Sequence, residues 1–260
     1  MCIRDRLCTP HVGRCSWQRA LNTRLGVIAA LPFEAACFSS KPVHPGTYQV
    51  VTPELYVFCA GMGADNASQA TQALIAADVD ALVSWGVAGA LDPELASGDT
   101  VLPVQVRDSE QHVYTTDHAW HASLKSRLGQ QQLFADGTIL SVHDVQHEVR
   151  SKSDLHQATQ ALAVDMESAA VARVALNANK PFVVVRTIFD NASMRIPASS
   201  TNATDQYGQV SIPKLISGLI KKPAEVLQYP QMIGSFAKAK KSLLHIAELC
   251  GHDLCFPPKS

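Results

Sequence analysis

Three carboxylates lie where the pattern of apolar runs predicts that strands end. Glu34 follows the run over 25–31, Asp190 closes the most strand-like run of the chain, and Glu167 begins a helix predicted over 165–178. The carboxyl ends of strands in an open α/β sheet form the edge at which ligands bind. We therefore expect the three carboxylates to converge on one pocket, where they could bind polar groups or transfer protons.

Glu167 is unusual because it heads an apolar stripe. If the helix begins near Asp165, the apolar residues three, four and seven positions after Glu167 lie on the same helical face. A carboxylate at a helix start can simply complement the helix dipole, and this role is sufficient for Asp165. On the core-facing edge a carboxylate must instead be paired or hydrogen-bonded. The pattern leaves Glu167 open between a dipole role and a ligand role.

The other signals also have structural explanations. Asp190 could cap the end of its strand, and Glu34 could be solvated on a short helix that begins at Pro32. The Gly-Met-Gly turn at 61–63 could present backbone N–H groups to an anion, although most such turns are only tight turns. Trp85, at a predicted strand end, is expected to pack in the core rather than to stack on a base.

Metal and cofactor signatures are weak. His143 and His147 have the spacing of helical metal ligands, but no third ligand with a diagnostic spacing accompanies them. The chain has neither a Gly-x-Ser-x-Gly elbow nor a Walker loop. We therefore expect no metal and no organic cofactor.

The composition is that of an ordinary globular protein. The chain has 260 residues, 47% of them hydrophobic, which suffices for one large α/β domain. Its formal net charge of -1 gives no reason to expect a nucleic-acid partner, and no stretch is apolar for long enough to span a membrane. The odd number of cysteines and their spacing predict free thiols in a reducing cytoplasm. They are Cys2, Cys8, Cys15, Cys37, Cys59, Cys250 and Cys255.

The first 24 residues lack clear periodicity. The opening MCIRDR resembles the in-frame translation of a sequencing adapter, and residues 7–24 are basic and contain cysteine. We set residues 1–24 aside as an artefactual or disordered leader. The native chain is expected to begin near Arg24.

Apolar runs alternate with helical patterns along the rest of the chain. Strands are predicted at 25–31, 48–51, 55–60, 81–87, 100–106, 138–142 and 181–189. Helices are predicted at 32–38, 64–77, 118–129, 149–160, 165–178 and over most of 210–249. This alternation, without an internal repeat or a linker, predicts a single three-layer α/β/α domain.

Five motifs then point to a known family. LGVIAALPFEAA, CAGMGADNA, SWGVAGALDPELASGD, VDMESAAVA and PFVVVRTIFDNA occur in this order between residues 25 and 220. Their order and spacing resemble those of the nucleoside phosphorylase and nucleosidase superfamily, in particular the branch with methylthioadenosine/S-adenosylhomocysteine nucleosidases. The segment KKPAEVLQYPQMIGSFAKAKKSLLHIAEL resembles a narrower group, the hopanoid-associated phosphorylases. The resemblance implies a central mixed sheet, a catalytic domain over 25–222 and a helical extension over 223–260.

The resemblance also implies roles for the carboxylates. Glu167 matches the residue that accepts hydrogen bonds from the ribose 2′- and 3′-hydroxyls, with Met166 against the sugar. Asp190 matches the acid that protonates purine N7, and Glu34 matches the base that activates water. Binding of the two ribose hydroxyls would then explain why the carboxylate of Glu167 lies on the apolar edge of its helix. An acid and a base placed in this way each contribute roughly 10²–10⁴-fold in rate.

Further substrate contacts follow from the same resemblance. The segment with Val87, Ala88 and Gly89 borders the base, and Gly63 lies in the turn near the nucleophile. Phe189 replaces a small or polar residue of the family and is expected to affect the orientation of the acid.

The chain departs from the phosphorylases around the glycine turn of the fourth strand. Members that bind phosphate place arginine and serine there, whereas this chain has Ser84 and Val87. Anion binding would depend on backbone N–H groups and on Arg186 or another cation. Glu34 favours hydrolysis, although inorganic phosphate stays open as a co-substrate.

The function expected from the resemblance is cleavage of the N-glycosidic bond of an adenine nucleoside, with adenosylhopane as the leading substrate in hopanoid biosynthesis. A methylthioadenosine/S-adenosylhomocysteine nucleosidase or another purine nucleoside phosphorylase is the alternative. The non-enzymatic alternative is a catalytically inactive nucleoside-binding module. We expect a small-molecule nucleoside as ligand, no nucleic acid, and a homodimer.

The C-terminal region is basic and amphipathic. Between residues 211 and 249 six lysines stand against two glutamates, among many apolar residues. Helices that pack their apolar faces on the domain and leave lysines in water would explain this pattern. The alternative is peripheral contact with an anionic membrane, to which each lysine would contribute about 1 kcal/mol. The lysines are Lys214, Lys221, Lys222, Lys238, Lys240 and Lys241.

Overall fold

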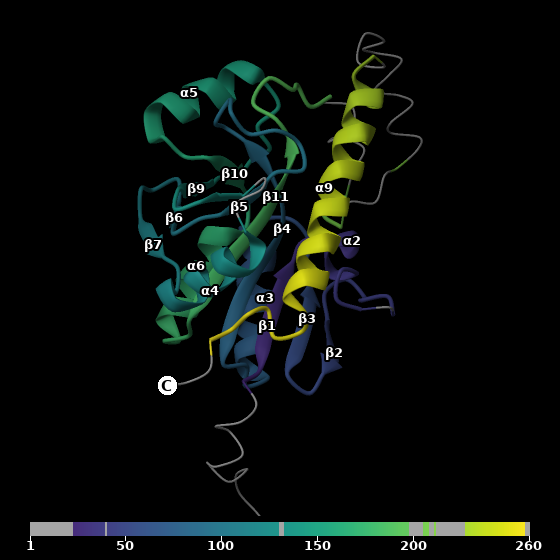
Figure 1. The fold of residues 1–260 in the computed structure, drawn as a ribbon, viewed down its shortest axis with the longest axis vertical. Coiled ribbons are helices and arrows are strands. Elements are labelled where there is room, and N and C mark those ends of the chain that lie inside the picture. The colour runs from purple at the N-terminus through teal and green to yellow at the C-terminus, as the bar shows by residue number, and fades with distance from the viewer. Residues whose placement is uncertain are drawn as a thin grey trace, which may run out of the picture.

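A central mixed sheet with helices on both faces forms the molecule (Figure 1). The computed structural model describes residues 23–39, 41–129, 133–197, 205–207, 211 and 227–257. The predicted three-layer α/β/α domain is confirmed. The leader over 1–22, three of the cysteines and the segment 212–226, with Lys214, Lys221 and Lys222, lie outside the described residues.

Four parallel strands form the middle of the sheet in the order β3-β1-β4-β11. These are β1 (Leu25–Ala29), β3 (Leu55–Cys59), β4 (Ala81–Ala90) and β11 (Phe182–Asp190). Because they run in the same direction, their carboxyl ends meet at one edge. The carboxylates that follow these strands are thereby brought together.

Shorter strands extend the sheet on either side. β2 (Tyr48–Thr52) pairs antiparallel with β3, and β10 (Ala163–Asp165) pairs antiparallel with the end of β4. Beyond β10 lie β9 (Thr138–Ser141), β6 (Gln105–Arg107) and β7 (Val113–Thr115). Beyond β11 lie β5 (Thr100–Leu102) and β8 (Leu133–Ala135).

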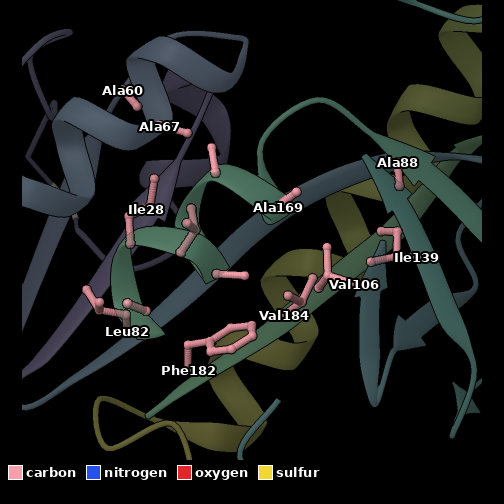
Figure 2. Packing of buried hydrophobic residues seen from close by; sticks show 14 of the residues in the cluster. Ile28, Ala60, Ala67, Leu82, Ala88, Val106, Ile139, Ala169, Phe182 and Val184 are labelled. Carbon is pink, nitrogen blue, oxygen red and sulfur yellow. The ribbon is translucent and has the colours of Figure 1, made fainter. Parts of the chain in front are cut away.

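Alternate residues of the central strands enter two separate cores, because successive side chains of a strand point to opposite faces. On one face Leu82 and Val184 pack with residues of α3 (Ala64–Ala76) and α6 (Ser168–Asn177), as Figure 2 shows for part of this cluster. On the other face Val83 and Trp85 pack with residues of α2 (Pro32–Ala35), α4 (His118–Leu128) and α9 (Tyr229–Cys250). The expected core position of Trp85 is confirmed.

Helix α9 belongs to the second core. Figure 1 shows it lying along β11, and its residues Leu243 and Ile246 are buried there. No helix in the described part of the chain combines the length and the apolar composition needed to cross a bilayer. The remaining helix in the described part of the chain, α5 (Val149–Thr159), lies near the carboxyl end of β11.

Three predicted elements differ from the structure. The run over 100–106 is two strands, β5 and β6, because Pro103 cannot donate a ladder hydrogen bond. The helix predicted from 165 begins at Ser168, since Asp165 is the last residue of β10. In the C-terminal region the described helix is α9 alone, and β7, β8 and β10 were not expected.

Candidate active site

The three carboxylates converge as predicted. Glu34, Glu167 and Asp190 line one cavity of about 580 Å³ at the carboxyl edge of the central strands. The predicted contact residues Val87, Ala88, Gly89, Met166 and Phe189 line it too. Gly63 is not part of the lining, but its backbone supports Glu167. The size is typical of a small-molecule site.

Glu34 is held entirely by backbone groups on its two oxygens. The N–H of Val87 donates to Oε1 at 2.9 Å, and the N–H of Leu31 donates to Oε2 at 2.8 Å. The residue is 2% exposed, so the explanation that it is a solvated helix residue is wrong. Burial raises the pKa of Glu34 to about 7, although Arg186 and the two N–H donors oppose this shift. A carboxylate with such a pKa can accept a proton near neutral pH.

Glu167 is the N-cap of α6 and turns its side chain away from the helix. The N–H of Gly63 donates to its Oε1 at 2.8 Å, and Arg186 Nη2 lies 3.7 Å from its Oε2. This contact spans 104 positions and ties the glycine turn before α3 to the cavity. Burial and Asp165 raise the pKa of Glu167, and Arg186 opposes them. The observed contacts therefore do not support the dipole role, and Glu167 faces the cavity with a fixed orientation.

Arg186 forms a buried polar network beneath the carboxylates. It is 2% exposed, and its guanidinium donates to Asp165 at 2.8 Å, to Ser84 at 2.9 Å and to Ser168 at 3.1 Å. Asp165 lies at the start of α6 as expected, where its Oδ1 accepts the backbone N–H of Ser168 at 3.2 Å, and it is in addition the ion-pair partner of Arg186. Burial alone would lower the pKa of Arg186, but Asp165, Glu167 and Glu34 raise it. These protein contacts engage Arg186, contrary to the expectation that it could hold a phosphate.

A β-bulge places Asp190 in the cavity. Ile188 pairs with Ala88 and Asp190 pairs with Gly89, so Phe189 is an extra residue without a partner on β4. Consecutive residues of a regular strand point to opposite faces, whereas Phe189 and Asp190 both line the cavity. A side chain on Gly89 would have its Cβ 3.2 Å from Asp190 Oδ1, which explains the glycine there. Asp190 is 3% exposed, and its side chain faces the cavity.

Lys152 is a site residue that the sequence reasoning missed. Its side chain is fully buried, lines the cavity and forms an ion pair with Oδ2 of Asp190. Burial raises the pKa of Asp190, and Lys152 opposes that shift. A weak signal was available, because Lys152 stands three positions before Leu155, whose side chain packs on a buried cluster. A lysine on an apolar helical face, like the carboxylate of Glu167, must have a partner that compensates its charge.

An apolar wall forms part of the lining of the cavity. We use this name for Phe33, Phe189, Tyr229, Met232 and Phe236, all of which line it. The ring of Phe236 lies 4.8 Å from that of Phe33 and 6.4 Å from that of Phe189, both edge to face. Phe189 therefore packs beside Phe236, and the wall depends on α9.

The histidine pair stays outside this arrangement. His143 and His147 precede α5, and neither is among the residues that line the cavity. The described residues contain no group of three potential metal ligands.

The chain resembles known proteins in sequence. A profile of the phosphorylase superfamily matches residues 24–212. The 5′-methylthioadenosine/S-adenosylhomocysteine nucleosidase of Mycobacterium tuberculosis is 28% identical over 220 residues, which cover 65% of this chain and 86% of that protein.

Two solved structures share the fold. The 5′-methylthioadenosine/S-adenosylhomocysteine nucleosidase of Helicobacter pylori, bound to butyl-thio-DADMe-Immucillin-A, has a TM-score of 0.60 and 21% identity, covering 88% of this chain and 99% of that one. The futalosine hydrolase of the same organism has a TM-score of 0.58 and 21% identity, covering 86% and 97%. The family profile spans well over half of the sequence. The chain therefore belongs to the phosphorylase superfamily of enzymes.

Proposed function

We propose that this protein hydrolyses the N-glycosidic bond of an adenine nucleoside. The convergence of Glu34, Glu167 and Asp190 on one cavity carries the proposal. Breaking the bond leaves positive charge on the sugar and negative charge on the base, so an acid at the base and carboxylates near the sugar favour the transition state. Protonated Asp190 gives its proton to the purine, ionised Glu34 takes a proton from the attacking water, and Glu167 accepts hydrogen bonds from the ribose hydroxyls.

The charges around the cavity support hydrolysis over phosphorolysis. Among the described residues that line it, five are acidic and one, Lys152, is basic. Lys152 is engaged by Asp190, and Arg186 is engaged by Asp165, so both cations are already matched by protein groups. A phosphate dianion would meet uncompensated carboxylates there, whereas a water molecule would not. The similarity to nucleosidases that act on methylthioadenosine supports adenine as the base.

The apolar wall supports a nucleoside with a large apolar 5′ substituent, for which adenosylhopane is our leading candidate. Tyr229, Met232, Ile233 and Phe236 follow the helical spacing i, i+3, i+4 and i+7 and share one face of α9. Phe236 is 39% exposed and Ile233 is 64% exposed, so this face continues from the cavity into solvent. A tail too long for the cavity could follow it outward. The protein would then act in hopanoid biosynthesis.

Exposed residues in and just before α9 support contact with a membrane from which a lipid-tailed nucleoside could be taken. Leu227 and Ile233 are exposed near the cavity, and Lys238, Lys240 and Lys241 are exposed further along α9. Apolar side chains can enter the headgroup region while lysines attract anionic lipids. The protein would be cytoplasmic and bind the inner surface of the membrane reversibly.

Release of free adenine tests the proposed reaction. The purified protein is incubated with methylthioadenosine and with adenosine carrying a long 5′ alkyl chain, each with and without inorganic phosphate. We expect adenine in both conditions, faster release from the alkylated nucleoside, and loss of release in Asp190→Asn. A strict requirement for phosphate would make the protein a phosphorylase. Binding without adenine release would identify it as an inactive binding module.

We also propose that the protein is a homodimer, as the resemblance implies. Light scattering at micromolar concentration is expected to give about twice the mass of the chain, whereas a monomeric mass would contradict the proposal.

A further inference from the structure

The proposed hydrolysis gives no task to the buried cation of the cavity. Lys152 is fully buried on α5, and an ammonium group held away from water is costly unless its partners compensate. Purely structural burial of a lysine is uncommon for this reason. The partners of Lys152 therefore indicate what it does.

All three donors of the ammonium group are matched by protein oxygens. Nζ donates to Oδ2 of Asp190, to the carbonyl of Asn191 at 3.0 Å and to the carbonyl of Met194 at 2.8 Å. A lysine ammonium has three N–H donors, so none remains for a ligand. Lys152 can thus act on a substrate only through Asp190.

Two opposing influences meet at Asp190. Burial raises the pKa of its carboxyl group, and Lys152 lowers it by charge and by hydrogen bonding. His147, on the loop before α5, also lowers it, while the neighbouring residue of β4 is the uncharged Gly89. Burial favours the protonated form that precedes the reaction, and the ammonium group favours the carboxylate that follows it.

We propose that Lys152 is a positioning residue that holds Oδ2 of Asp190 and stabilises the carboxylate formed when Asp190 protonates the departing base. This inference rests on the proposed function, because it takes Asp190 to be the acid. In that step the electron pair of the N-glycosidic bond moves to the base. The O–H bond of Asp190 breaks as a new N–H bond forms on the purine, and the negative charge left on Asp190 lies beside the ammonium group.

Lys152→Met removes the charge and keeps the length of the side chain. We expect kcat to fall about 10- to 100-fold, the range of one hydrogen bond to a charged group. Asp190 must be protonated to act, so activity is lost as the pH rises through its pKa. Without the cation this pKa rises, and the alkaline limb of the pH–kcat profile should move to higher pH.

Arg195→Gln is the matched control. Arg195 forms an exposed ion pair at 2.7 Å with Glu148, the N-cap of α5, and so joins α5 to the segment after β11 without touching Asp190. This variant should keep both the wild-type kcat and the alkaline limb. If Lys152→Met loses activity with an unmoved limb, Lys152 only supports the structure and the inference is wrong.

The double variant Lys152→Met/Asp190→Asn separates the remaining outcomes and removes the ion pair as a unit, which protects folding if the single variant fails to fold. If Lys152 acts through Asp190, the double variant should match Asp190→Asn alone within about twofold. A further loss would overturn the inference. Wild-type turnover by Asp190→Asn would instead refute the acid assignment, and with it the proposed function.

Discussion

The cavity has two sides that are built in opposite ways. The carboxylate floor, which comprises Glu34, Glu167 and Asp190, is held by backbone N–H groups and buried cations at strand ends and at a helix start. The apolar wall consists of side chains whose outer members on α9 are partly exposed. The floor cannot change without disturbing a hydrogen-bonded network, whereas the wall can change one side chain at a time. Mutations in the floor should therefore change the rate of the reaction, whereas mutations in the wall should change the choice of substrate.

The largest effect is expected for Glu34→Gln in the floor. Loss of the base should lower kcat by roughly 10²–10⁴-fold. Because Glu34 must be ionised to accept a proton, the wild-type rate should rise as the pH increases through about 7. The variant should lose that rise, as a pH–kcat profile would show. The exposed Glu94→Gln provides the control, and a retained rise would mean that another group is the base.

Glu167→Gln should have the next largest effect and should act through the ribose. A hydrogen bond to a charged acceptor contributes about 1.5–3 kcal/mol, so kcat/KM for a ribonucleoside should fall about 10- to 100-fold. A 2′-deoxynucleoside lacks one of the hydroxyl partners and should lose less. Steady-state kinetics with the two substrates measures this difference. Equal losses for both would remove Glu167 from ribose recognition.

A smaller and more selective effect is expected for Phe236→Ala in the wall. Phe236 is partly exposed, so its truncation should cost about 1 kcal/mol of apolar contact, or about fivefold in KM for a nucleoside with a long alkyl tail. KM for methylthioadenosine should hardly change. Leu244→Ala, an exposed residue of α9 that does not line the cavity, is the control. An equal rise in KM for both nucleosides would show that the wall does not select the tail.

The smallest effect is expected for Lys240→Gln, outside the cavity. A lysine near an anionic surface contributes about 1 kcal/mol, so the variant should bind phosphatidylserine vesicles about fivefold more weakly at low salt. Salt should weaken the binding of both proteins, and neutral vesicles should bind neither. Sedimentation with vesicles measures this. If wild-type binding does not depend on salt, the lysines of α9 are only a solvated helical face.

The floor could be predicted from the sequence because its residues follow strong local patterns. Glu34 and Asp190 stand next to buried apolar runs, and parallel strands bring their carboxyl ends together. Lys152 was missed because its partner is 38 positions away and most residues of its own helix are polar. The ion pair of Asp165 was missed for the same reason, because its buried partner Arg186 lies 21 positions along the chain.

The wall could not be predicted because it joins residues that are remote in sequence. Phe33 and Phe236 meet edge to face, and no local periodicity specifies that contact. The amphipathic pattern of α9 indicated a helix with one buried face but not the strand on which it packs. Phe189 was noted as a departure next to the acid, and its partner on α9 is visible only in three dimensions.

The bulge at Phe189 makes the site sensitive to the length of β11 rather than to its composition. Substituting Phe189 would change the wall and leave the backbone path that carries Asp190 in place. Deleting one residue of β11 before the bulge would instead shift every later residue of the strand by one position and turn the side chain of Asp190 towards the opposite face of the sheet. A single lost codon would then remove the proton donor from the cavity without changing the type of any remaining side chain. Insertions and deletions in this strand should thus be far less tolerated during evolution than exchanges of its side chains.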